Sequence, residues 1–332
     1  ILMSFFKEIF SFTSVEFQGN DFSKQFRSLY LFEHWSVATF HALTYYYMFK
    51  NIGRSFKVKK YFYTYENNSW ERMGILALNK YSPYSICVGY QHNVIPLASA
   101  NMFLGEGEEE SSPVPHEIYT VGARPKEILE AYGSYQKIKI KTTCALRYQY
   151  LELMKPSSPR LDGHILLVAL EGVWQAAEIM NSIFSQADLL KDWIIVVRTH
   201  PVLPYSLLSK KINFDIENYN NFQISSGTTL QEDVKNSSIV LYWGSTVGFE
   251  SIKMGRPVIN FKYGKTFDFD PLFELSHFKW DWFPDESLKK VLDKIINLNE
   301  LDRKNEMEQA LVYLKDYFYP ITKANLKPFL ED

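Results

Sequence analysis

Residues 164–200 read HILLVALEGVWQAAEIMNSIFSQADLLKDWIIVVRTH. Two near-continuous apolar stretches, 164–170 and 192–200, flank a segment with helical spacing at 173–190. Continuous apolar stretches of this length are typical of strands that are buried on both faces of a parallel sheet. Strand, crossover helix and strand form the repeating unit of a doubly wound α/β sheet.

The same alternation continues toward both ends of the chain. Downstream, the pattern predicts strands at 222–226, 238–242 and 257–261 and helices at 229–235, 246–254 and 286–298. Upstream, it predicts strands at 59–65, 85–90, 117–121 and 137–141 and helices at 69–79 and 125–132. We therefore expect an α/β protein with two Rossmann-like domains that face a cleft.

Residues 151–163, LELMKPSSPRLDG, have the composition of a linker, with two prolines, two serines and a terminal glycine. The sequence has 332 residues, enough for two domains of ordinary size. We expect an N-terminal, acceptor-side domain at 1–150 and a C-terminal, nucleotide-sugar-binding domain at 151–332. Because the sequence does not begin with Met, we also expect it to lack the first part of the N-terminal domain.

The composition excludes several classes of protein. A formal net charge of -2 provides no basic field for nucleic acid. Cys87 and Cys144 are the two cysteines, too few for a disulfide framework, which favours a cytoplasmic location. The longest apolar stretch is too short to cross a bilayer. A basic, aromatic segment at 45–60 is expected to be a solvated helix end, with contact to the anionic inner membrane as the alternative.

Residues 242–261, YWGSTVGFESIKMGRPVINF, predict a phosphate-binding turn between a buried strand and a helix. Free backbone N–H groups at a helix start bind phosphate, and Gly244 adds no side-chain bulk. We expect Gly244, Ser245 and Thr246 to hold a phosphate and Glu250, one turn into the helix, to reach ribose hydroxyls. An ordinary turn capped by Ser245 is the alternative.

Two further groups of polar residues follow predicted strands. Arg198 and His200 stand at the carboxyl end of a buried strand, where doubly wound folds bind their ligands, and Pro201 ends the pairing of that strand. We expect Arg198 to bind the nucleotide and His200 to bind a phosphate or protonate a leaving group.

The first domain offers a second set of strand-end residues. Glu66 follows the strand at 59–65, where it is a candidate general base or nucleophile. His92 follows the next strand and is a further catalytic candidate. Asn67 and Gln91, beside them in the chain, are expected to bind substrate.

Three short motifs occur in a telling order: YENNSWE at 65–71, RTHP at 198–201 and GSTVGFE at 244–250. This order resembles that of bacterial sialyltransferases and of the Kdo and polysialic acid transferases that build capsule and lipopolysaccharide. The resemblance implies the GT-B architecture, a CMP-linked acidic sugar as donor and a glycan or glycolipid acceptor. It also implies that His200 and the Ser245–Thr246 pair hold the CMP phosphate and that Glu66 is the catalytic carboxylate. The chain departs from the family where Glu-Asn-Asn replaces an acidic pair followed by Gly.

We expect neither a metal nor a cofactor, because we identify no ligand cluster with metal-like spacing and no Asp-x-Asp motif of the kind that carries a divalent ion in metal-dependent sugar transferases, and the CMP-sugar would be a substrate. Inversion at the sugar needs one base, whereas retention needs a second carboxylate, for which Glu16, Glu33 and Glu71 are candidates. Three other functions stay open: a nucleotide-sugar 2-epimerase, a CDP-polyol phosphotransferase and a carbohydrate-binding module without nucleotide affinity.

Overall fold

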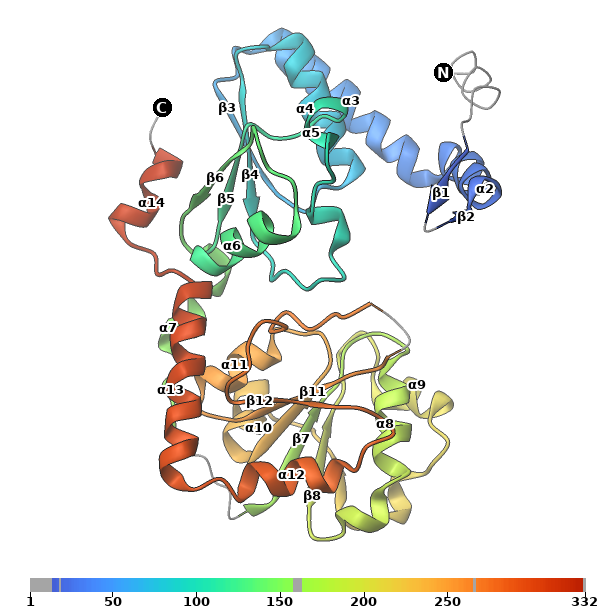
Figure 1. The fold of residues 1–332 in the computed structure, drawn as a ribbon, viewed down its shortest axis with the longest axis vertical. Helices are drawn as coiled ribbons and strands as arrows, with labels where there is room; N and C mark the ends of the chain where they lie inside the picture. Colours follow the sequence, from blue (N-terminus) through green and yellow to red (C-terminus); the bar gives the residue numbers. More distant parts are fainter. Residues whose placement is uncertain (1–13, 18, 158–162, 265–266, 331–332) are drawn as a thin grey trace. The chain divides into compact units, whose positions relative to one another are not determined.

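The computed structural model describes residues 14–17, 19–157, 163–264 and 267–330 (Figure 1). The chain divides into two compact units. The first comprises Ile1–Tyr90, Leu104–Ile118 and Tyr135–Lys139, and the second comprises Gln91–Phe103, Tyr119–Ser134 and Ile140–Asp332. Over the described ranges, no helix combines the length and the apolar character needed to cross a membrane.

A six-stranded parallel sheet forms the centre of the second unit (Figure 1). Its strands lie in the order β9-β8-β7-β10-β11-β12, which is the strand order of the Rossmann fold. The strands are β7 Ile165–Ala169, β8 Ile194–Arg198, β9 Phe222–Ile224, β10 Ile239–Tyr242, β11 Val258–Phe261 and β12 Lys279–Trp282. The chain proceeds from β7 to β9 on one side and returns to place β10 beside β7. The topological switch point therefore lies between β7 and β10.

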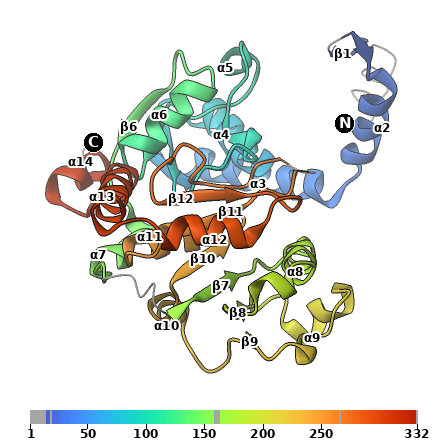
Figure 2. The same cartoon turned by 60° about the horizontal axis from the view of Figure 1, so that its bottom comes forward.

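Helices cover both faces of this sheet (Figure 2). Because side chains alternate along a strand, each strand contributes to two apolar layers. Leu166 and Leu241 belong to a core shared with α8 (Ala176–Phe184) and α12 (Leu288–Ile296). On the other face, the sheet contacts α10 and α11, which span Leu230–Asn236 and Val247–Lys253.

A second sheet has four strands in the order β3-β4-β5-β6. These are β3 Lys60–Thr64, β4 Ile86–Gln91, β5 Glu117–Thr120 and β6 Lys139–Thr142, and β3 pairs with β4 in parallel. Its helices include α3 (Val37–Ser55), α4 (Ser69–Tyr81), α5 (Glu108–Ser111) and α6 (Ala123–Tyr132). The shorter elements are β1 Glu16–Phe17, β2 Asn20–Asp21, α2 Ser23–His34, α7 Tyr150–Leu153 and α9 Tyr205–Leu208. The predicted α/β class with parallel sheets is confirmed.

Two helices at the end of the chain, α13 (Glu300–Tyr317) and α14 (Lys323–Leu330), contact the region around β5. The Tyr119 hydroxyl donates a hydrogen bond of 2.9 Å to the carbonyl of Pro328, and its ring packs edge-on against Phe329. Part of the expected linker, residues 158–162, lies outside the described residues. The division of the chain near residue 150 stays a prediction.

Candidate active site

A pocket of about 710 Å³ opens at the switch point of the six-stranded sheet. It is lined by residues that follow β7, residues that follow β10 and two phenylalanines from a later loop: Glu171, Val173, Gln175, Trp243, Gly244, Phe267 and Phe269. The carboxyl ends of strands at a switch point are where open α/β sheets bind ligands. The pocket combines aromatic walls with one carboxylate and one amide, the usual composition of a small-molecule site.

Glu171 is the charged side chain of this pocket. Its Oε1 accepts hydrogen bonds from the backbone N–H groups of Trp243 at 3.3 Å and Gly244 at 3.0 Å. Burial raises the pKa of Glu171, while hydrogen bonds from these backbone amides act in the opposite direction. The turn that the sequence predicts to bind a phosphate is therefore occupied by a carboxyl group of the protein itself.

The residues of this turn have other contacts as well. A Cβ at Gly244 would lie 2.7 Å from the Cβ of Phe269, so the close approach of this loop explains the glycine. Helix α11 begins at Val247, after Thr246, and has seven residues. Glu250 is buried and accepts a 3.0 Å hydrogen bond from the Tyr150 hydroxyl, and burial raises its pKa.

His200 lies just beyond β8, next to the loop that carries Glu171. A Cβ at Gly172 would lie 2.7 Å from the Nδ1 atom of His200, so the imidazole packs directly on this glycine. The backbone N–H of Val202 donates to Nδ1 at 3.2 Å. In the neutral ring the proton therefore resides on Nε2, which is a hydrogen-bond donor. His200 is exposed, which suits a ligand-binding role.

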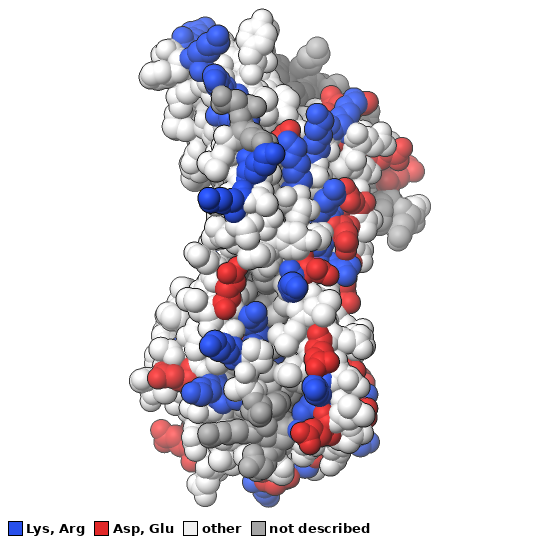
Figure 3. All heavy atoms as spheres, turned by 90° about the vertical axis from the view of Figure 1, so that its left-hand side faces the viewer, with Lys and Arg blue, Asp and Glu red and all other residues white. Residues whose placement is uncertain are grey.

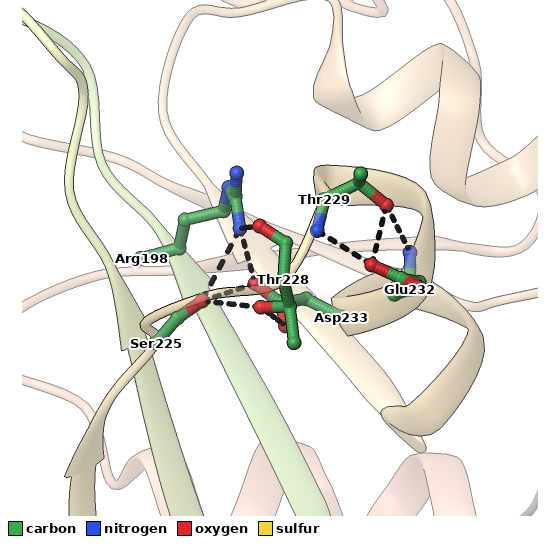
Figure 4. Close-up of polar contacts among 6 residues, drawn as sticks. All are labelled: Arg198, Ser225, Thr228, Thr229, Glu232 and Asp233. Atoms are coloured by element: carbon green, nitrogen blue, oxygen red, sulfur yellow. Dashed lines mark hydrogen bonds and ion pairs between the residues drawn. The ribbon is translucent and has the colours of Figure 1, made fainter.

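Arg198 has internal partners instead (Figure 4). Its Nη1 atom donates to Ser225 at 3.2 Å and to the carbonyl of Thr228 at 3.0 Å, and it lies 2.6 Å from a carboxylate oxygen of Asp233. Burial acts to raise the pKa of Asp233, but hydrogen bonds from Ser225, Thr228 and Arg198 hold it below its usual value. The guanidinium thus ties β8 to the start of α10, where Thr229 and Glu232 form a capping box.

At the end of β3, the turn before α4 is organised by Glu71. Its carboxylate accepts N–H groups from Glu66 at 3.2 Å and from Asn67 at 2.8 Å. Glu71 is buried, which raises its pKa to about 7. Asn67 is buried at φ 58° and accepts a 3.0 Å hydrogen bond from Arg72, whereas Glu66 is half-buried and its carboxylate accepts one from Asn68 at 3.2 Å.

Gln91 and His92 follow the neighbouring strand. Gln91 is fully buried, and its side chain bridges the backbone of two segments, donating to the carbonyl of Asn93 and accepting from the N–H of Val121 at 3.2 Å. His92 is half-buried. The structure thus brings His200, Gly244 and Ser245 together around Glu171, within one unit. The binding and catalytic roles of all the predicted residues stay predictions.

The expectation that the chain has no Asp-x-Asp motif is wrong, because Asp268 and Asp270 form one. Both carboxylates are used internally. Asp268 pairs with Lys262 at 2.9 Å, and the buried Asp270 pairs with Lys279 at 2.8 Å and accepts from the Tyr242 hydroxyl at 2.7 Å. No group of three or more His, Cys, Asp or Glu side chains that could hold a metal occurs among the described residues.

No family model and no curated protein matches the chain. Its fold is similar to that of a chain in the GtfA/B complex, with a TM-score of 0.53 and 11% identity over 87% of this chain. The chain spans 60% of that chain's length. Two further solved structures are glycosyltransferase SnogD from Streptomyces nogalater (TM-score 0.48, 14% identity, 87% and 79% of the two chains) and UDP-GlcNAc 2-epimerase from Methanocaldococcus jannaschii with UDP-GlcNAc and UDP (TM-score 0.44, 13% identity, 82% and 80%). The likeness to the GtfA/B chain shows the fold alone, two Rossmann-like domains of the GT-B type.

Proposed function

We propose that the chain is a glycosyltransferase that takes a sugar from a nucleotide donor. The observation that carries the proposal is the pocket at the switch point between β7 and β10, with Glu171, Trp243 and Phe269 in its wall. Its volume of about 710 Å³ is in the range of sites for small organic ligands. Aromatic faces pack on flat rings, and a carboxylate accepts hydrogen bonds from hydroxyl groups.

We further propose that the donor is a CMP-linked acidic sugar, such as Kdo, sialic acid or a related ulosonic acid, and that the acceptor is a surface glycan or glycolipid. The order of the Glu66, His200 and Ser245–Thr246 motifs along the chain supports this choice. The Nε2–H of His200 would donate a hydrogen bond to the phosphate and stabilise its charge as CMP departs. Glu66, at the end of β3, would accept the proton of the acceptor hydroxyl.

The position of Glu171 sets a condition on this proposal. A phosphate and the carboxylate cannot both accept from the N–H groups of Trp243 and Gly244. Either the phosphate binds beside His200 and the Ser245 hydroxyl while Glu171 stays in place, or the carboxylate leaves the turn when the donor binds. In both arrangements Glu171 lowers the affinity for an anionic ligand, because like charges repel across a partly buried site.

Isothermal calorimetry with CMP, CDP and UDP tests both the proposed class of enzyme and the proposed nucleotide of the donor. Binding of CMP in preference to the other two supports the proposed donor. Preference for CDP indicates a polyol phosphotransferase, and preference for UDP with conversion of UDP-GlcNAc in the absence of an acceptor indicates a 2-epimerase. Failure of all three nucleotides to bind would leave a carbohydrate-binding module and overturn the proposal.

A further inference from the structure

Helix α3 carries apolar side chains around its whole circumference. Its inner face is packed: Ala42 and Phe49 are buried, and the rings of Tyr45 and Phe49 contact Trp70 and Tyr61. Its outer face also carries exposed apolar side chains, with Val37 at 85%, Phe40 at 54% and Tyr47 at 53%, next to the exposed polar residues His41, Thr44 and Asn51. A helix that is apolar all round is normally covered on all sides.

Helix α2 extends this exposed surface. Phe26, Leu29 and Phe32 follow one another at intervals of three residues, and each is at least half exposed. Trp35, in the connection to α3, is 51% exposed. We define the exposed apolar stripe as Phe26, Leu29, Phe32, Trp35, Val37, Phe40, Tyr47 and Met48.

The charged residues in and next to α2 and α3 along the chain are mostly positive. Between residues 14 and 60 the sequence contains seven Lys and Arg residues and three acidic residues, Glu16, Asp21 and Glu33. Near the end of α3, Lys50 lies 5.4 Å from the centre of the Tyr47 ring and Arg54 lies 4.8 Å from that of Tyr81. Figure 3 presents the side of Figure 1 that faces away from α2, and the Lys and Arg side chains in its upper part are therefore not evidence about the stripe.

We propose that the exposed apolar stripe docks on an anionic membrane surface, with the helices lying in the interface. Aromatic and aliphatic side chains enter the boundary between headgroups and acyl chains, and neighbouring Lys and Arg side chains attract acidic headgroups. Contiguous exposed apolar surface of this kind marks an interaction site. A second copy of the chain is the competing occupant, but a symmetric pair would bring the same basic set against itself, and Glu16, Asp21 and Glu33 in each copy are too few to offset seven Lys and Arg residues.

The test is flotation of the full chain with vesicles of phosphatidylcholine alone or mixed with phosphatidylglycerol. We expect binding to the anionic vesicles only and weaker binding as salt is raised. Phe32→Asp with Phe40→Asp should reduce vesicle binding at least tenfold, because both side chains would carry charge into the interface. Lys24→Glu with Lys57→Glu should also reduce it on the order of tenfold, since each Lys near an acidic surface contributes to the attraction.

The matched control is Val202→Asp with Val312→Asp, two side chains that are 72% and 60% exposed outside the stripe. This control should float like the parent. Equal flotation of the Phe32→Asp, Phe40→Asp protein, or no flotation of the parent, would overturn the proposal. The proposal would also be overturned if analytical ultracentrifugation showed that the parent is a dimer and that the Phe32→Asp, Phe40→Asp protein is a monomer. The stripe would then contact a second copy of the chain. CMP calorimetry on the same variants should be unchanged, which keeps this test separate from that of the proposed function.

Discussion

Glu171 follows β7 by two residues and places its carboxylate in the turn after β10, where its Oε1 accepts from the N–H groups of Trp243 and Gly244. An anion in that turn competes electrostatically with the phosphate of a nucleotide. The energy of two unit charges a few ångströms apart at an effective dielectric constant of about 20 is on the order of several kcal/mol before screening. A single substitution can therefore measure the effect.

We predict that Glu171→Gln increases the affinity for CMP about three- to tenfold. Gln keeps an oxygen that accepts from the two amides, so the turn should retain its shape while the repulsion is removed. Calorimetry compares this variant with Glu178→Gln, an exposed carboxylate on α8, which should bind like the parent. A weaker affinity in Glu171→Gln would instead mean that the carboxylate contacts the ligand directly, for example through hydroxyl groups.

The other residue-scale prediction concerns Glu66. Glu66→Gln should reduce the rate of sugar transfer on the order of 100-fold or more and leave the CMP affinity within a few-fold of the parent. Gln keeps the size of the side chain and removes its basicity. Initial rates with saturating donor, calorimetry and a melting curve are to be measured on one preparation. A variant that melts earlier but transfers at the parental rate would show that Glu66 supports the β3–α4 turn and is not the base.

Strand-end residues could be identified from the sequence because apolar strands and the residues behind them are local features. Their partners could not, since these are distant in the chain. Arg198 forms an ion pair with Asp233, and Glu250 accepts a hydrogen bond from Tyr150. Gly244 packs closely against Phe269. Glu171 was missed although its position, directly behind the best-defined strand, gave the same local signal as His200. Its role in the pocket depends on the backbone N–H groups of Trp243 and Gly244, which lie 72 and 73 residues further along the chain.

At the scale of elements, the predicted helix at 173–190 is divided into α8 and a short 3-10 turn at Ala187–Leu190. The break falls at Gln186, whose side chain accepts from the N–H of Leu288 at 2.8 Å and donates to the carbonyl of Glu286 at 2.9 Å. Contacts with the start of α12 thus override the local helical pattern. The sequence does not predict β12 or α13, because Lys279 and Asp281 interrupt the apolar residues of β12 and the buried residues of α13 all lie in its second half.

The β3–α4 turn provides an element-scale prediction of pH dependence. Burial raises the pKa of Glu71 to about 7, whereas an unfolded Glu has its usual value near 4.3. Between these values the unfolded chain has lost its proton and the folded chain has kept it, so stability falls as pH rises toward 7 and then levels off. The loss for one such group should be roughly 1 to 3 kcal/mol.

Glu71→Gln should remove that part of the pH dependence, because Gln does not ionise. Denaturant unfolding of the parent and the variant at pH 5, 6, 7 and 8 measures the slope. Glu152→Gln, an exposed carboxylate, is the control and should keep the parental slope. Identical slopes in the Glu71→Gln and parent proteins would show that the buried carboxyl ionises in the folded chain as easily as in the unfolded one.

At the scale of the molecule, all residues that line the switch-point pocket belong to the second unit and fall between Glu171 and Phe269. A ligand that binds only the native state stabilises it by about 2.7 kcal/mol at a ligand concentration of a hundred times Kd. The stabilisation slows hydrogen exchange in those segments that must open for the ligand to dissociate. We therefore predict that CMP slows amide hydrogen exchange in peptides from 164–175 and 239–249 and leaves peptides from 23–64 unchanged. Hydrogen–deuterium exchange with mass spectrometry measures both sets at once, and inorganic phosphate at the same concentration should produce a smaller slowing because it lacks the base and ribose. Slowing at 23–64 without slowing at 164–175 would move the nucleotide site to the other unit, since a ligand protects the segments it contacts.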